Sequence, residues 1–248
     1  MAYPIHRYRA FADLTPQEEA HLAALGDPEV LRPKGETFQM EGDLIHGFYL
    51  HTRGWIASSI TLPSGKRLIQ KLHLPGDMLA TPSMALTAAA DTLTAVTDAA
   101  TAFVPYERFG QLFASAPRLA ALFTIAVQME RLSLMDALAV QGTASAKEQL
   151  ARLFLDLHAR LSPLGLVDDD GFDLPLTQET LGDLLGMTNV HVNRTLRALE
   201  DAGVIARRGR RLELLDMAAL RGLSPLPPRR PRFQAGWLPP VGQPIPNG

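Results

Sequence analysis

The apolar residues between positions 117 and 140 recur at alternating spacings of three and four, which is the period of an α-helix. We therefore predict a helix from Pro117 to about Val140. Such spacing is also typical of the line of contact between two paired helices, so we expect this helix to form a dimer. The predicted contact positions are Leu122, Ile125, Met129, Leu132, Asp136 and Ala139. The alternative is a helix packed on its own domain, and the polar Asp136 departs from the pattern.

A second helical pattern follows a short interruption. Residues Gly142-Thr143-Ala144-Ser145 are small and read as a hinge. From Ala146 to about Leu161 the apolar residues again share one face of a helix. A loop that contains Ser162-Pro163, Gly165 and the acidic run 168–170 comes next, and we interpret that run as solvated turn residues rather than a metal site.

The pattern between Leu31 and Val104 is different, because short apolar segments alternate with glycine turns. Such evenly spaced short strands predict an antiparallel roll or barrel. Before them, Thr15-Pro16-Gln17-Glu18 has the cap, proline and early carboxylate of a helix start. The segments expected as strands are 37–40, 48–50, 55–60, 68–74 and 101–104.

The region from Leu176 to Leu215 has the pattern of two short helices and a hairpin. Thr177 and Thr188 are suitable N-caps, and Gly186 permits a tight turn between the helices. Apolar residues of the second helix face inward, which leaves its polar residues outside. A helix with such a polar face fits the major groove of DNA. The predicted DNA contacts on the helices are Thr177, Thr188, Asn189, Val190, His191, Asn193, Arg194 and Arg197.

Charge supports a DNA-binding role for this region. The whole chain has a formal net charge of −2, but residues 194–211 contain six arginines and only two acidic residues. Segments 204–206 and 212–215 are expected to form a two-stranded wing around the turn, with its arginines on the phosphate backbone. The wing arginines are Arg207, Arg208, Arg210 and Arg211. A helical hairpin with an ordinary basic surface is the alternative.

The segment TQETLGDLLGMTNVHVNRTLRALEDAGVI, followed by RRGRRLELLD, resembles the helix-turn-helix of the Crp/Fnr regulators. PKGETFQMEGD and LHLPGDML resemble parts of that family's β-roll, so the resemblance covers most of residues 10–222. It implies that Arg194 reads guanine and that Thr188, Asn189 and Val190 lie where the family contacts phosphates and bases. The family often has Arg-Glu at the Asn189-Val190 positions, so the resemblance implies DNA binding but does not imply which DNA sequence is preferred.

The resemblance predicts an α+β fold with four parts. Residues 1–116 form a β-roll sensor-like domain with an N-terminal helix, 117–142 a dimerisation helix and hinge, 143–222 a winged helix-turn-helix domain, and 223–248 a proline-rich disordered or extended tail. The expected function is a sequence-specific transcription regulator, a homodimer on an inverted repeat of double-stranded DNA with RNA polymerase as a partner. Its effector stays unknown.

We expect no bound cofactor. Cysteine is absent, which excludes cysteine-held iron–sulfur clusters. Relatives that bind cyclic nucleotides use a Gly-Glu pair and an arginine after the Pro-Gly-Asp turn, but no lysine or arginine occurs between Gly76 and Tyr106, so we predict no cyclic-AMP control. His46, His51 and His73 are candidate haem ligands, although a lone strand histidine is more often structural. Residues 78–90 either line an apolar effector pocket or fill the core.

Other classes of function are disfavoured. The chain contains none of the common catalytic motifs, and we expect no enzyme and no metal site. It has no apolar run long enough for a membrane span and no apolar N-terminal leader, so a cytoplasmic protein is expected. The competing hypothesis is a sensor or scaffold protein whose helix-turn-helix contacts proteins. Residues Pro227–Pro231 offer a further extended segment for a partner.

Overall fold

The structure is a computed structural model, and it describes residues 5–227, 229 and 231–241. The chain divides into two compact units. One contains residues 5–58 and 72–132 with the described residues after position 230, and the other contains 59–71 and 133–229. No described helix is both long enough and apolar enough to cross a membrane.

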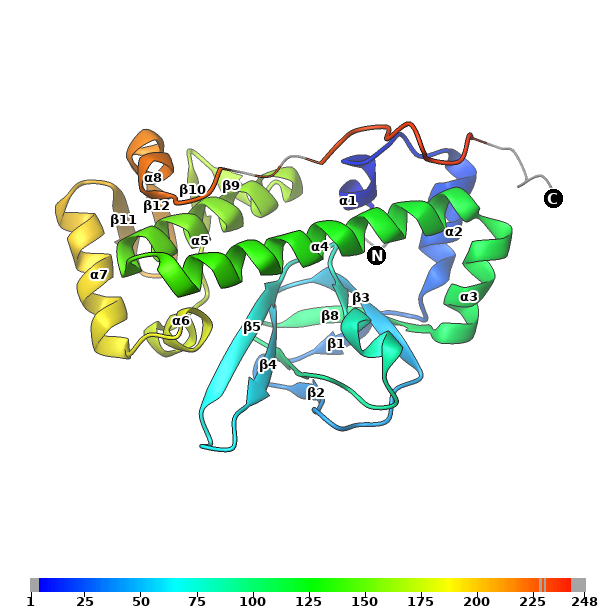
Figure 1. Cartoon of the computed structure of the whole chain (residues 1–248), viewed down its shortest axis with the longest axis horizontal. Coiled ribbons are helices and arrows are strands. Elements are labelled where there is room, and N and C mark those ends of the chain that lie inside the picture. Colours follow the sequence, from blue (N-terminus) through cyan, green and yellow to red (C-terminus); the bar gives the residue numbers. More distant parts are fainter. Residues whose placement is uncertain (1–4, 228, 230, 242–248) are drawn as a thin grey trace. The chain divides into compact units, whose positions relative to one another are not determined.

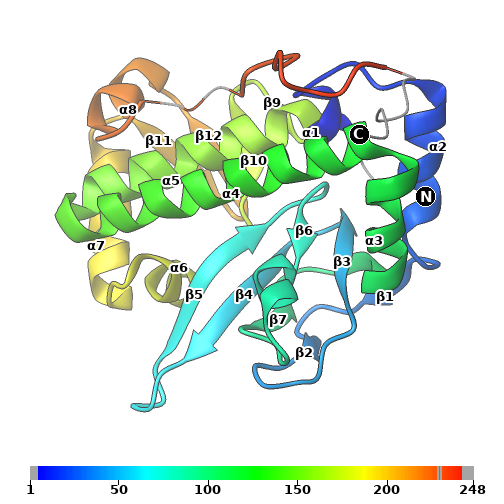
Figure 2. The ribbon, with the colours of Figure 1, turned by 45° about the vertical axis from the view of Figure 1, so that its right-hand side comes forward.

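The N-terminal strands form two four-stranded sheets with the orders β1-β8-β3-β6 and β2-β7-β4-β5. The pairs β1–β8, β3–β8, β3–β6 and β2–β7 are antiparallel, which confirms the predicted roll; β4 and β5 run side by side in Figure 2. The strands are β1 (Val30–Arg32), β2 (Thr37–Gln39), β3 (Gly47–Arg53), β4 (Ile56–Thr61), β5 (Arg67–His73), β6 (Met78–Leu79), β7 (Thr92–Ala95) and β8 (Ala99–Pro105).

Helices precede and follow the roll (Figure 1), and the longest of them confirms the helix predicted from Pro117. They are α1 (His6–Arg9), α2 (Pro16–Leu25), the 3-10 helix η1 (Thr81–Ala85), α3 (Tyr106–Ser115) and α4 (Pro117–Thr143). Tyr8 and Phe123 pack at 5.0 Å between ring centroids in a core that includes Phe48 and Leu119. A second cluster, around Ile56, lies between strands of the roll. Of residues 78–90, which were expected either to line an effector pocket or to fill the core, Met78 belongs to the first cluster and Leu79 to the second. These two residues are therefore part of the core.

The structure differs from the prediction at the expected dimer contacts of α4. Leu122 is fully buried, and Ile125 and Met129 pack against the same core cluster. Leu132 is half-buried, Asp136 is 5% exposed and only Ala139 is fully exposed. The two buried residues, Leu122 and Asp136, are thus occupied within the chain, and the other four stay predictions. The face that α4 exposes instead has four large apolar side chains, Val127, Leu134, Met135 and Leu138, which we call the α4 stripe.

Only the second half of the predicted hinge, residues 144–145, lies outside the helices. Helix α4 continues to Thr143, so Gly142 is helical. The break falls at Ala144-Ser145, because Ser145 is the N-cap of α5 (Ala146–Leu161), and the bounds of this helix agree with the prediction. Its capping box with Glu148 satisfies the first free N–H groups of α5.

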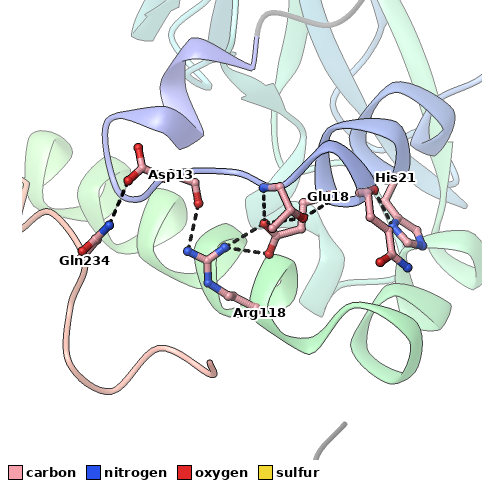
Figure 3. A network of polar contacts seen from close by, with 7 residues as sticks. Asp13, Glu18, His21, Arg118 and Gln234 are labelled. Carbon is pink, nitrogen blue, oxygen red and sulfur yellow. Dashed lines mark hydrogen bonds and ion pairs between the residues drawn. The ribbon is translucent and has the colours of Figure 1, made fainter. Parts of the chain in front are cut away.

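A buried ion pair joins α4 to the start of α2 (Figure 3). Arg118 Nη1 donates to both carboxylate oxygens of Glu18, at 2.7 and 2.8 Å, and Arg118 Nη2 donates to the carbonyl of Asp13 at 3.0 Å. Glu18 also closes the capping box with Thr15. Both charged side chains are about 90% buried, since they expose 10% and 12%. Such a pair holds the helices in one register only while both partners are present.

The described part of the C-terminal tail has neither helix nor strand, but it is anchored at several points. Gln234 Nε2 donates to Asp13 Oδ2 at 3.0 Å (Figure 3), and its backbone N–H donates to the carbonyl of Phe11 at 2.7 Å. Ala235 is buried and Leu238 packs on the first core cluster. The extended-tail prediction is thus tested only in part, because Pro228, Arg230 and residues 242–248 lie outside the described residues.

The turn after β5 lies where the sequence resembles the start of the nucleotide-binding segment of the Crp/Fnr family, and its residues make contacts within the chain. Asp77 pairs with Arg7 of α1 and lies 3.7 Å from His73 Nδ1. Ala80 adopts a left-handed backbone with φ of 62°, which is strained for a residue with a Cβ atom. His73 Nε2 lies 3.1 Å from Ser58 Oγ. His73 is thus held by strand neighbours, whereas His46 is exposed.

Candidate nucleic-acid interface

The second unit contains the predicted helix-turn-helix and its wing. Helix α5 comes first, and the helical pair α6–α7 then lies in the chain between strands β9–β10 and β11–β12, which together form a four-stranded sheet with the order β11-β12-β10-β9. The remaining elements are η2 (Ser162–Leu164), β9 (Val167–Asp168), β10 (Gly171–Asp173), α6 (Gln178–Leu185), α7 (Asn189–Asp201), β11 (Ile205–Arg208), β12 (Arg211–Leu214) and α8 (Met217–Leu223). The observed wing strands β11 and β12 lie within two residues of the predicted segments.

Both helices begin at the predicted caps. Thr177 Oγ1 accepts a hydrogen bond from the Thr180 N–H at 3.0 Å, and Thr188 Oγ1 accepts one from the His191 N–H at 3.3 Å. The turn between them requires Gly186, whose φ is 69°. The first turn of α7 therefore presents backbone N–H groups and no acidic side chain, which favours an approaching phosphate.

Close packing of α6 against the turn depends on Gly182, which the sequence reading did not single out. A Cβ atom at this position would lie 2.7 Å from the carbonyl oxygen of Met187 and 3.2 Å from Asn189 Oδ1. No side chain fits there without moving the start of α7. The available signal was a glycine inside a helical pattern, which usually has a packing reason.

The two sides of α7 differ sharply. Val192, Leu196 and Leu199 are buried, as predicted. A shallow hollow runs along the outer side of the helix and is lined by Gln178, Asn189, Val190, Asn193, Arg194, Arg197, Ala198 and Asp201. His191 is half-buried and does not line this hollow. The structure thus brings five of the predicted contact residues to one surface, and it adds Gln178.

Arg194 and Arg197 are the two cations of this surface. Both are exposed, and neither has a hydrogen-bond or ion-pair partner in the described part of the chain. An arginine that is free of carboxylates keeps all five donors for a ligand. A guanidinium matches both the guanine edge and a phosphate, because it donates two parallel hydrogen bonds.

Asn193 is held in place by its neighbour on α6. Its side-chain Nδ2 donates to Gln178 Oε1 at 3.0 Å. This bond fixes the amide plane and leaves the Asn193 carbonyl oxygen and one N–H for a ligand. Because Gln178 comes from the other helix, the interface is assembled by both helices rather than by α7 alone.

Three of the four wing arginines form ion pairs at hydrogen-bond distance, one of them half-buried and two of them exposed. Arg207 Nε and Nη2 donate to Glu200 at 2.8 Å each, and this contact holds the pKa of Glu200 below its usual range. Arg210 Nη2 lies 2.9 Å from Asp173 Oδ2, and Arg211 pairs with Asp168. Arg208, which is largely exposed, is 3.7 Å from Glu213. The prediction that all four arginines contact the phosphate backbone did not take these acidic partners into account.

The acidic run 168–170 has a structural role that agrees with a turn. Asp169 and Asp170 have positive φ values of 43° and 58°, and they connect β9 to β10. Asp168 binds Arg211, and Asp170 Oδ1 lies 3.2 Å from His158 Nε2. Among the described residues, no three histidine, aspartate or glutamate side chains gather into a possible metal site.

Two contacts fix α6 from outside the helical pair. Gln141 Nε2, near the end of α4, donates to the carbonyl of Leu184 at 2.9 Å. Arg67, at the tip of the β4–β5 hairpin, donates to Asp183 through Nε and Nη2 at 2.9 and 2.7 Å. These hydrogen bonds connect α6 to the end of α4 and to the start of β5.

Family models match both parts of the chain. A cyclic nucleotide-binding domain matches residues 29–116, and a Crp-like helix-turn-helix domain matches residues 148–223. Among solved structures, FixK2 from Bradyrhizobium japonicum has a TM-score of 0.72 at 23% identity, over 81% of this chain and 98% of that one. This likeness shows the same fold.

Curated relatives match over most of their length. The nitrogen fixation regulation protein FixK of Bradyrhizobium diazoefficiens is 32% identical over 77% of this chain and 79% of its own. The transcriptional activator protein FnrL of Cereibacter sphaeroides is 30% identical over 83% of each chain. With an α+β fold, a cyclic nucleotide-binding-like domain and a DNA-binding helix-turn-helix, the chain belongs to the Crp/Fnr family of transcription regulators.

Proposed function

We propose that this regulator binds an inverted-repeat DNA site as a homodimer, with one α7 helix in the major groove of each half-site. The observation that carries the proposal is the outer face of α7, where Arg194 and Arg197 are exposed and make no hydrogen bond or ion pair among the described residues. Helix capping and Gly186 hold this face rigid, which lowers the conformational cost of binding. Half-sites of such dimers are about 34 Å apart.

The α4 stripe supplies the contact between the two copies in this proposal. Val127, Leu134, Met135 and Leu138 expose between 38% and 71% of their surface. Val127 and Leu134 are seven residues apart, and Leu138 follows four residues later, so they share one side of the helix. An apolar stripe of this kind is self-complementary in a two-fold dimer, because the same residues meet across the axis. The proposed dimer contact therefore lies on the face of α4 opposite to the one expected from the sequence.

We also propose that cyclic AMP does not control this protein. Ala80 and Thr81 stand where the nucleotide-binding relatives have Gly-Glu, and residues 77–105 contain no lysine or arginine. Arg32 of β1 is already paired with Glu36 at 2.9 Å and lies 4.5 Å from the centre of the Phe38 ring. Burial raises the pKa of Asp91 to about 6, so this region already disfavours a negative charge. A cyclic phosphate would add another.

The proposed output is regulation of transcription through RNA polymerase, without catalysis by the chain itself. Binding upstream of a promoter or across it would give activation or repression, respectively. An in-vitro transcription assay with purified polymerase and the selected DNA site measures which of the two occurs. If the protein changes transcript yield by less than about twofold, whether its site lies upstream of the promoter or across it, that result would count against a direct contact with polymerase.

Selection of bound sequences from a random double-stranded DNA pool tests the proposal. We expect an enriched inverted repeat and, by analytical ultracentrifugation, two chains per DNA site. An enriched sequence without symmetry would contradict the dimer, and no enrichment would contradict DNA recognition by the free protein. Salt dependence separates the competing scaffold role: binding to several phosphates weakens steeply with salt, whereas an apolar protein interface does not.

A further inference from the structure

Val190 is out of place on the outer face of α7. Its exposed fraction is 79%, the highest among the large hydrophobic residues that the structure describes. The other large apolar residues of α7, such as Val192 and Leu196, are buried below 2%. Val190 therefore contributes nothing to the core, and its neighbours along the surface are polar.

The surroundings of Val190 are those of a ligand surface. It lines the same hollow as Asn189, Asn193 and Arg194. Arg194 is four residues further along α7, so both side chains lie on the same side of the helix. The first turn of α7 contains no acidic residue that could accept a hydrogen bond from a cytosine amino group. An exposed apolar side chain at this place has one apolar partner in a major groove, the C5-methyl group of thymine.

We propose that Val190 recognises a thymine methyl group in each half-site and is a specificity-determining residue. This inference rests on the proposed binding of DNA by α7. Val190 offers two methyl groups and no donor or acceptor, so it distinguishes bases by apolar contact alone. Burial of one methyl group favours binding by about fourfold, which corresponds to ~0.8 kcal/mol.

The geometry of α7 places this thymine relative to the guanine of Arg194. Four residues of a helix rise about 6 Å, and successive base pairs are about 3.4 Å apart. The thymine methyl therefore lies within about two base pairs of the guanine that Arg194 contacts. Cytosine at this position lacks the methyl group, and the first turn of α7, where Val190 lies, contains no carboxylate that could accept from its amino group.

Replacement of thymine by deoxyuridine tests the inference, because it removes the methyl group and keeps every hydrogen bond of the base. On the selected inverted repeat, fluorescence anisotropy should show about fourfold weaker binding for one substituted half-site and about fifteenfold for both, at one position only. Val190→Ala, which keeps only the Cβ methyl, should show a smaller difference between the thymine and deoxyuridine sites. Val190→Thr, which keeps one methyl group, should retain part of the difference.

The outcomes separate the two proposals. Equal affinity of the unaltered protein for thymine and deoxyuridine at every position of an enriched site overturns this inference and leaves DNA binding intact. A thymine preference that is undiminished in Val190→Ala assigns the methyl contact to another residue and also overturns it. Failure to enrich any DNA overturns both proposals. Because Val190 is exposed, thermal unfolding of the variants should match that of the unaltered protein.

Discussion

Asp136 of α4 accepts two hydrogen bonds from Arg229 of the C-terminal tail, one from Nε at 2.9 Å and one from Nη2 at 2.8 Å. Arg152 of α5 lies 3.7 Å from the same carboxylate. The residue that broke the apolar pattern of α4 is thus buried, ionised and paired within the chain. The tail supplies the planar, bidentate partner that a buried carboxylate requires.

This pair predicts a specific dependence of stability on pH. The hydrogen bonds from Arg229 hold the pKa of Asp136 below its usual range. A lowered pKa stabilises the folded state fully above the unfolded value of roughly 3.9, and this stabilisation is lost as pH falls through the folded value. Arg229→Gln should therefore lower the urea midpoint at neutral pH, and the difference should close below about pH 4. Arg232→Gln, an exposed change of equal charge in the same tail, should have no such dependence.

Loss of Arg118 is expected to cost far more than loss of a surface arginine. Arg118→Ala leaves Glu18 buried without its partner, so the free energy of unfolding should fall by about 3–5 kcal/mol. The control is Arg9→Ala, whose pair with Glu19 is exposed and worth less than about 1 kcal/mol. Chemical denaturation followed by circular dichroism measures both. Equal losses would mean that the buried pair has no special weight.

Two arginines of the DNA-binding unit are expected to act differently. Arg194→Ala should cost about 1–3 kcal/mol in specific binding and relax the preference at one base pair per half-site. Arg207→Ala removes the clamp on Glu200 and should lower stability while the base preference stays unchanged. Arg221→Ala, an exposed arginine of α8, is the control for charge alone. Intact discrimination in Arg194→Ala would place the reading residue elsewhere on α7.

Ala80 tests whether backbone strain is present in the β-roll, because glycine should be tolerated there better than at an unstrained buried position. Its φ of 62° costs roughly 1–2 kcal/mol for a residue with a Cβ atom, and glycine removes this cost. The greater freedom of glycine in the unfolded chain offsets roughly 0.5–1 kcal/mol. Loss of the buried Ala80 methyl group costs a further ~0.8 kcal/mol, so Ala80→Gly should be close to neutral, whereas Ala95→Gly, at a buried strand position without this strain, should lose about 1–2 kcal/mol. A loss in both variants would contradict the argument from strain.

The α4 stripe predicts the effect of a charge on dimerisation. Leu138→Glu replaces a 71% exposed leucine, and the two-fold axis places the change in both copies. The loss of two buried leucines should weaken the dimer at least about a hundredfold. Leu215→Glu, at a 58% exposed leucine after β12, should leave association unchanged. Sedimentation at several concentrations distinguishes the results.

Strong local signals made much of the fold predictable. Helix α5 follows from its capping serine and its apolar face, and the long strands follow from their spacing between glycines. β6 and β9, of two residues each, were not predicted, because two residues show no alternation. Helix α3 was missed although its apolar residues follow a helical period. For these elements, contacts from distant segments decide the structure.

The candidate site was predictable in residue type but not in pairing. The arginines of the wing are visible in the sequence, whereas Asp168 is 43 residues away from Arg211 and no local pattern connects them. The same limit affected α4, where apolar residues at helical spacing occur on two faces and the sequence does not say which face is inside. Gln178 was missed because its role depends on Asn193 of the other helix.

The carboxylates around the wing alter what happens when DNA arrives. Any of Arg207, Arg210 and Arg211 that turns to a phosphate must first leave its own acidic partner. An arginine that binds a phosphate through such an exchange replaces its carboxylate partner with the phosphate. We therefore expect DNA binding to depend less steeply on salt than the number of wing arginines suggests. For the same reason, we expect the wing to discriminate against nonspecific polyanions, and most of the favourable free energy of DNA binding to come from α7 in the proposed complex.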